Sequence, residues 1–129
     1  MKKIINLTQH ISTNAQKEEG VVDLPETLRK ELINLLTFEE MPDKNEILKR
    51  SKSIKDLALK VMNILNIDNG DGYFMIGGAP YLMPLLIEEI KCIGRTLFAF
   101  SKREVQENVL LNGTVEKKIV FKHEGFIEI

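Results

Sequence analysis

Tyr73-Phe74-Met75-Ile76-Gly77-Gly78-Ala79-Pro80 is the stretch that decides the fold, because a short apolar run leads directly into a glycine-bearing turn. An apolar run of this length that is bounded by turn residues predicts a buried strand. Over residues 81–93 the apolar side chains recur at helical spacing, which predicts a helix closed by Gly94. A strand, a tight turn and a helix in this order are typical of α/β proteins.

Two further apolar runs, at residues 3–7 and 96–100, predict strands before and after this unit. Polar residues follow both runs: the first continues to His10, and the second continues into Ser101-Lys102-Arg103-Glu104. Parallel strands of an α/β sheet bind ligands beyond their carboxyl ends. We therefore expect the ends of the three strands to form one site.

Helices are predicted in the two intervals between these strands. Asp23-Leu24-Pro25-Glu26 has the residue types of a helix start, with Asp23 as the capping side chain. Met41-Pro42-Asp43 marks a second start, and apolar residues keep a helical spacing from Asn45 to Asn66.

Asn112-Gly113 separates the runs at residues 105–111 and 114–121 and predicts a β-hairpin at the end of the chain. The predicted fold class is therefore α/β. We expect residues 1–129 to form a single Rossmann-like domain, with a three-stranded parallel core and a C-terminal antiparallel hairpin at its edge.

The composition of the 129 residues excludes several classes of protein. Lys and Arg number 18 and Asp and Glu number 19, so the net charge is −1, which excludes a histone-like excess of positive charge. The sequence shows no recognition helix or RNA-binding signature, so a binder of double-stranded DNA is not expected. No apolar run reaches the roughly 18–20 residues of a membrane span, and no export signal is recognisable, so we expect a cytoplasmic protein. One Cys and two His are too few for a disulfide framework and make a metal site unexpected. We also expect no cofactor.

The clearest candidates for ligand binding are the turn after the central strand and the polar cluster after the last parallel strand. Gly77, Gly78 and Ala79 would let backbone amides approach a phosphate beside a helix start, although the same residues suit a simple tight turn. Ser101, Lys102 and Arg103 supply a hydroxyl and two cations for a phosphate, although an ordinary charged loop has the same composition.

Two histidines complete the candidate site. Thr8, Gln9 and His10 follow the first strand, where His10 is suited to transfer a proton or bind a phosphate, or else to pack within the loop. His123 lies near three lysines at the end of the chain, which suit a solvated edge strand or an extended positive surface. Residues 91–123 contain seven Lys or Arg against three Asp or Glu, which favours a small anionic ligand.

Residues scattered over most of the chain, and densest over 98–126, resemble a known family. The sequence is similar to the very small CRISPR-associated proteins of Rossmann-like (CARF-like) fold that are proposed to be ring nucleases. The residues that carry the resemblance are His10, Thr13, Gln16, Leu24-Pro25, Tyr81, Met83, Phe98-Ala99-Phe100-Ser101-Lys102-Arg103, Glu107, Asn112-Gly113-Thr114-Val115, Lys117, Val120-Phe121-Lys122-His123 and Phe126.

The resemblance implies a homodimer that binds a cyclic oligoadenylate, with the tetra-adenylate preferred, and cleaves it without a metal to end type III CRISPR signalling. Arg103 and Lys102 would bind the reacting phosphate and His10 would transfer a proton, with His123 a weaker candidate for that role. Two alternatives stay open: a nucleotide sensor or sponge without catalysis, and a small protein-interaction module of the same fold.

Overall fold

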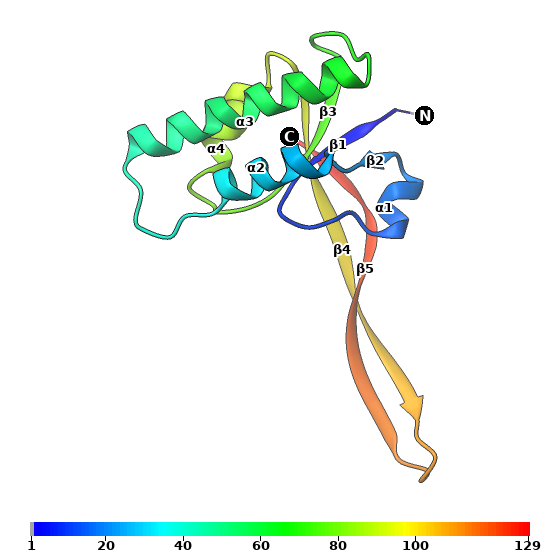
Figure 1. The fold of residues 1–129 in the computed structure, drawn as a ribbon. Helices are drawn as coiled ribbons and strands as arrows, with labels where there is room; N and C mark the ends of the chain where they lie inside the picture. Colours follow the sequence, from blue (N-terminus) through cyan, green and yellow to red (C-terminus); the bar gives the residue numbers. More distant parts are fainter. Residues whose placement is uncertain (1) are drawn as a thin grey trace.

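Within residues 2–129, which the computed structural model describes, five strands form one mixed sheet. They are β1 (Ile4–Leu7), β2 (Val21–Val22), β3 (Gly72–Ile76), β4 (Gly94–Val109) and β5 (Val115–Glu128). Their order across the sheet is β2-β1-β3-β4-β5 (Figure 1). The first three pairings in this order are parallel, and β5 runs antiparallel to β4.

The prediction of a Rossmann-like domain with a three-stranded parallel core is wrong in two respects. First, β2 extends the parallel part of the sheet to four strands. Second, β4 does not end at Phe100 but continues through Ser101-Lys102-Arg103-Glu104 as one strand of 16 residues. Polar residues are compatible with a strand that leaves the core and meets water, so this cluster is not a loop. The predicted antiparallel pair at the sheet edge is present.

Four helices accompany the sheet: α1 (Asn14–Glu18), α2 (Glu26–Leu36), α3 (Lys44–Ile64) and α4 (Met83–Ile90). α3 packs against both α2 and α4, and these three helices lie together on one side of the sheet (Figure 1). Their buried residues join those of β1 and β3 in the main core, which includes Ile5, Leu7, Leu32, Ile54, Leu57, Phe74, Leu86 and Ile90. None of the described helices combines the length and the hydropathy needed to cross a membrane.

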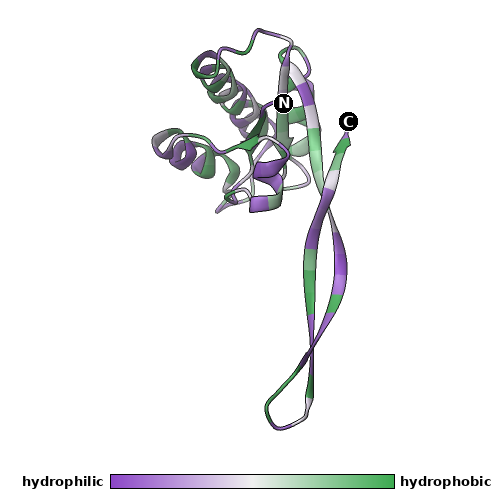
Figure 2. Ribbon diagram, turned by 90° about the vertical axis from the view of Figure 1, so that its right-hand side faces the viewer, coloured by the Kyte–Doolittle hydropathy of each residue, from purple (hydrophilic) through white to green (hydrophobic). Residues whose placement is uncertain are grey.

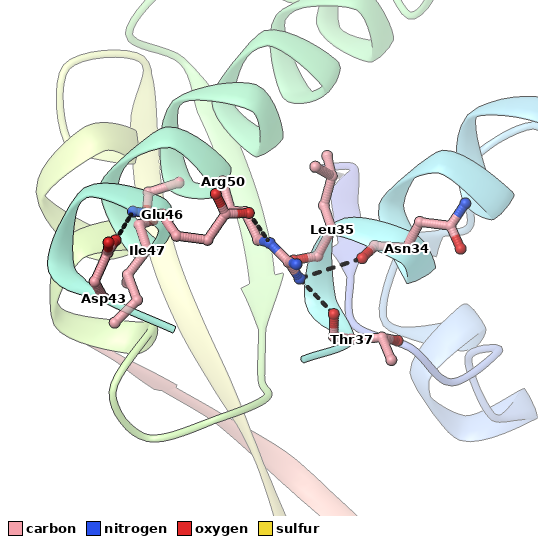
Figure 3. Close-up of polar contacts among 8 residues, drawn as sticks. Asn34, Leu35, Thr37, Asp43, Glu46, Ile47 and Arg50 are labelled. Carbon is pink, nitrogen blue, oxygen red and sulfur yellow. Dashed lines mark hydrogen bonds and ion pairs between the residues drawn. The ribbon is translucent and has the colours of Figure 1, made fainter. Parts of the chain in front are cut away.

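The predicted restart before the long helix is confirmed, because the Asp43 side chain caps α3 by accepting a hydrogen bond from the Glu46 amide at 2.8 Å. On the same helix, Arg50 pairs with Glu46 through Nε and Oε1 at 2.8 Å. Figure 3 shows the Arg50 guanidinium donating to the carbonyl of Asn34, in the last turn of α2, and to that of Thr37, just after the helix. The last carbonyls of a helix lack the amide donors of a following turn, so Arg50 adds to the bond that the Thr37 amide makes to Asn34 and ties α3 to the end of α2.

Beyond the other strands, β4 and β5 continue alone as a two-stranded arm, which we define as residues 101–123 (Figures 1 and 2). Pairing between β3 and β4 ends at Met75 and Leu97, whereas β4 and β5 stay paired as far as Val109 and Val115. At the tip, the Gly113 amide donates to the Leu110 carbonyl at 2.9 Å, and Gly113 has a φ of +86°. The predicted hairpin turn at Asn112-Gly113 is therefore confirmed.

Candidate functional site

A cavity of about 580 Å³ lies at the carboxyl ends of β1 and β3. It occupies a corner, because β1 and β3 stop there while β4 continues outward and contributes Phe98 and Ala99 to the wall. From Phe98 onward, the edge of β4 that faced β3 has no strand partner among the described residues. The lining consists of Thr8, Gln9, His10, Ile11, Thr13, Gln16, Met75, Ile76, Gly77, Gly78, Ala79, Phe98 and Ala99.

The structure brings together six of the residues that the sequence singled out. Thr8, Gln9 and His10 form one wall, and the turn of Gly77, Gly78 and Ala79 forms the wall beside it. Gly78 has a φ of +148°, a conformation that favours glycine, so the turn after β3 requires this residue.

The loop that carries Thr8, Gln9 and His10 is held by the buried side chain of Asn6. Asn6 Nδ2 donates to the His10 carbonyl at 2.7 Å, and Asn6 Oδ1 accepts from the Thr8 amide at 2.9 Å. Asn6 thus ties the two ends of the loop to β1. Because Asn6 is only 3% exposed, its hydrogen bonds are shielded from water and the loop shape is strongly specified.

Asp23 supports the same loop and does not cap a helix as predicted. The N-cap of α2 is Pro25, and it makes no side-chain hydrogen bond to the helix. Asp23 Oδ1 instead accepts from Asn6 Nδ2 at 2.8 Å and from the Ser12 amide at 3.1 Å. Burial opposes the charge on Asp23, but the hydrogen bonds from Asn6 and Ser12 outweigh it and hold the pKa of this carboxyl below its usual value.

Arg29 on α2 holds the loop from the opposite side. Its Nη2 donates to the Gln9 carbonyl at 2.8 Å, while Gln9 Nε2 donates to Thr37 Oγ1 at 3.3 Å. The sequence reasoning missed Arg29, which lies among ordinary charged helix residues. It also missed the positioning role of Asn6, although a polar residue inside the apolar run of residues 3–7 was the available signal.

The short helix α1 was not predicted, and two of its residues line the cavity. Thr13 caps α1 by accepting from the Gln16 amide at 3.2 Å, and the Thr13 amide donates to Gln16 Oε1 at 3.0 Å. This reciprocal pair is a capping box. Thr followed three residues later by Gln is its sequence signature, so this pattern could have revealed the helix.

Ser101, Lys102 and Arg103 do not line the cavity but follow it along β4, with exposed side chains. Successive residues of a strand project from opposite faces, so Lys102 and Arg103 do not point the same way. The bulge beside Ser101 adds its extra residue, Glu124, to β5 and leaves the alternation of β4 intact. Arg103 therefore shares its face with Ala99 and Lys102 shares its face with Phe98, and both Ala99 and Phe98 line the cavity.

His123 is also outside the cavity lining and belongs to a contact between the arm and α1. Its side chain is only 3% exposed, and Nε2 lies 3.1 Å from Oε1 of Glu19, the residue after α1. The ring also packs on Phe126, with centroids 5.0 Å apart. This environment indicates that His123 fixes the base of the arm.

The chemistry available in the cavity is that of binding through mixed apolar and polar contacts. Ile11, Met75 and Phe98 offer apolar surface to a flat ring, while hydroxyl and amide side chains and the glycine turn offer hydrogen bonds. His10 is the titratable side chain among the described lining residues. Within residues 2–129, no three His, Cys, Asp or Glu side chains are grouped so as to hold a metal ion.

A family model described as the uncharacterized protein MJ1673 family matches residues 2–127. The match includes both the cavity and the arm. Neither the curated proteins nor the solved structures contain a match to the chain.

Proposed function

The chain belongs to the MJ1673 family, and from the geometry of its site we propose that it binds a cyclic oligoadenylate, with the tetra-adenylate preferred, in the cavity beside β4. The observation that carries the proposal is the corner where a cavity lined without Asp, Glu, Lys or Arg meets an outgoing strand that bears Arg103. A nucleotide has the matching division into an apolar, hydrogen-bonding base and an anionic phosphate.

The lining supports the binding of a base. Phe98, Ile11 and Met75 would cover the faces of an adenine, and the side chains of Thr13 and Gln16 would reach its hydrogen-bonding edge. The volume of about 580 Å³ lies in the range of sites for small molecules, between about 300 and 1,000 Å³. A ring of several nucleotides extends beyond one such cavity, so the proposal includes a second copy of the chain that binds the remainder.

The proposed reaction is cleavage of the ring in the cytoplasm, without a metal. The ribose 2′-hydroxyl attacks the adjacent phosphorus, the bond from phosphorus to the 5′ oxygen breaks, and the leaving 5′ oxygen takes a proton from water. The products are a 2′,3′-cyclic phosphate and a 5′-hydroxyl. Arg103 would stabilise the charge that develops on the phosphate, and His10 would accept the proton of the attacking hydroxyl. Lys102, on the opposite face of β4, would contribute charge from outside the cavity.

The test is incubation of the purified protein with cyclic tetra-adenylate and excess chelator, followed by chromatography of the products and by calorimetry of binding. We expect Arg103→Ala to reduce the cleavage rate by about 10²-fold or more, since it removes a cation that stabilises the transition state. We expect a loss of about 10²- to 10⁴-fold for His10→Ala. Lys118→Ala, which removes a cation farther along the arm, is the matched control and should cleave like the wild type. Absence of both binding and product at stoichiometric protein would overturn the proposal.

A sensor or sponge that binds the ring without cleaving it is the second candidate. It is favoured by one observation, that His10 has no second titratable side chain beside it among the described lining residues to act as the general acid. In the same experiment this candidate gives binding that Gln16→Ala and Arg103→Ala weaken, with no product at any time.

A further inference from the structure

The arm is amphipathic, although nothing in the described part of the chain covers it. Strand alternation and the register of β4 with β5 place five large apolar side chains on one face, and all of them are between 49% and 76% exposed. We call this the apolar face of the arm: Val105, Val109, Val115, Ile119 and Phe121. The opposite face carries Lys102, Glu104, Gln106, Asn108, Glu116, Lys118, Val120 and Lys122.

This division is unusual for a ribbon in water. A two-stranded ribbon alone is only marginally stable, and contiguous exposed apolar surface marks a site of association. Figure 2 shows apolar segments continuing along the arm well beyond the helices and the rest of the sheet. The helices therefore cannot cover them, and the apolar face needs an occupant from outside the chain.

We propose that the occupant is a second copy of this chain, with the two arms face to face about a two-fold axis that runs along them. We call a β4 residue and its register partner on β5 a row. Such an axis places each β4 residue of one copy over the β5 residue of the same row in the other copy. Val105 would then meet Ile119 of the second copy, and Val109 would meet Val115. Apolar rows thus cover apolar rows without any shift of register.

The charged residues of the apolar face obey the same symmetry. Glu107 and Lys117 are paired in register, with Nζ and Oε1 3.9 Å apart and both side chains mostly exposed. The two-fold axis places Glu107 of each copy opposite Lys117 of the other copy, which gives two reciprocal ion pairs. Arg103 shares its row with Phe121 at the end of the face nearest the cavity, and the dimer contact does not require this row. The rows from Val105 to Val109 are each complementary to themselves, which is the requirement for a symmetric dimer.

The apolar face is long enough to contact a second copy over several rows. The rows from Arg103 to Val109 span roughly 20 Å at about 3.4 Å per residue. Leu110 and Leu111 extend the apolar surface at the tip, and both are exposed. The inference rests on the arm alone and does not depend on which ligand the cavity binds.

The first test compares neighbouring residues on the two faces. Ile119→Asp places a charge on the apolar face, and Lys118→Asp places the same charge on the polar face of the same strand. Light scattering after size exclusion, over a series of concentrations, should show dimers for the wild type and Lys118→Asp, and monomers for Ile119→Asp. Circular dichroism should show that all three are folded. A monomeric wild type at high micromolar concentration, or an Ile119→Asp variant that dimerises like the wild type, would overturn the proposal.

The second test separates a pair of identical arms from binding to some other protein. Glu107→Lys gives a chain with two lysines in this row, and Lys117→Glu gives a chain with two glutamates. Each variant alone opposes like charges and should dimerise about tenfold more weakly than the wild type. The equimolar mixture should recover dimers, because the lysine row of one chain faces the glutamate row of the other. A mixture that dimerises no better than the separate variants would rule out this arrangement of the arms.

Discussion

Asp23 is the residue through which acid should loosen the wall of the cavity. Its carboxylate accepts hydrogen bonds from Asn6 and Ser12, and these hold the pKa of Asp23 below the usual value of 3.8. A lowered pKa means that the folded state binds this proton less well than the unfolded state. The stabilisation is therefore complete above pH 3.8 and is lost as the pH falls through the lowered pKa.

Urea unfolding at a series of pH values tests this expectation with Asp23→Asn. At neutral pH the variant should be less stable than the wild type by about 1–3 kcal/mol, because Ser12 and Asn6 lose a charged acceptor. The difference should shrink as the pH falls below 3.8, since the variant has no carboxyl at this position to protonate. Asp68→Asn, in an exposed loop, is the matched control and should follow the wild type. A difference that stays constant down to low pH would contradict the role given to Asp23.

The residues at the cavity show which part of a site a sequence can predict. Thr8, Gln9 and His10 were identified because they follow an apolar run, and the parallel sheet gathers such strand ends at one edge. The supporting contacts were not predictable, since Asn6 and Asp23 are 17 positions apart and only the pairing of β1 with β2 brings their segments together. Asp23 also had a satisfactory local explanation as a helix cap, and that explanation was wrong.

At the scale of elements, β3 and β4 approach closely because glycines stand opposite each other. Gly72 is the register partner of Gly94, and a Cβ added to Gly94 would lie 2.3 Å from the Gly72 carbonyl oxygen. A backbone oxygen cannot move aside as a flexible side chain can. We therefore expect Gly94→Ala to destabilise the protein by about 3 kcal/mol or more, since the two strands must separate.

Gly125→Ala is the control for this substitution. Gly125 also lies in a strand, but an added Cβ there meets no atom within 4 Å. Thermal unfolding should place Gly125→Ala close to the wild type and Gly94→Ala far below it. Equal melting temperatures for the two variants would show that the Gly72–Gly94 contact relaxes without cost.

The elements that were predicted correctly have strong local signals, whereas the missed strand β2 and the missed continuation of β4 have none. The turn at Asn112-Gly113 depends on two residue types that adopt positive φ, and Gly113 does so. β2 has only two residues, too few for any periodicity. The continuity of β4 through residues 101–104 was hidden because a strand with both faces in water needs no apolar run.

At the scale of the whole molecule, the chain has a packed body and an arm that contributes nothing to the core. The main core draws on β1, β3 and the three longer helices, and no residue of the arm belongs to it. Of the seven Lys and Arg in residues 91–123, five lie in the arm, on both of its faces, and none lines the cavity. The cavity and the apolar face of the arm are thus separate regions, joined at the base of the arm where Arg103 follows the cavity wall.

This division predicts two levels of hydrogen exchange. Core amides of the body, such as those of Ile5 and Phe74, exchange through global unfolding, which in small domains costs about 5–15 kcal/mol. The pairing of β4 with β5 beyond Arg103 has no core to support it, so in the monomeric Ile119→Asp variant these amides should be protected at least about 10²-fold less than those of Ile5 and Phe74. In the wild type, the protection of the arm should rise with protein concentration as the second copy covers its apolar face, while that of the body stays unchanged. Arm amides in the monomeric variant that are protected as strongly as the core would show instead that the arm is stable without a partner.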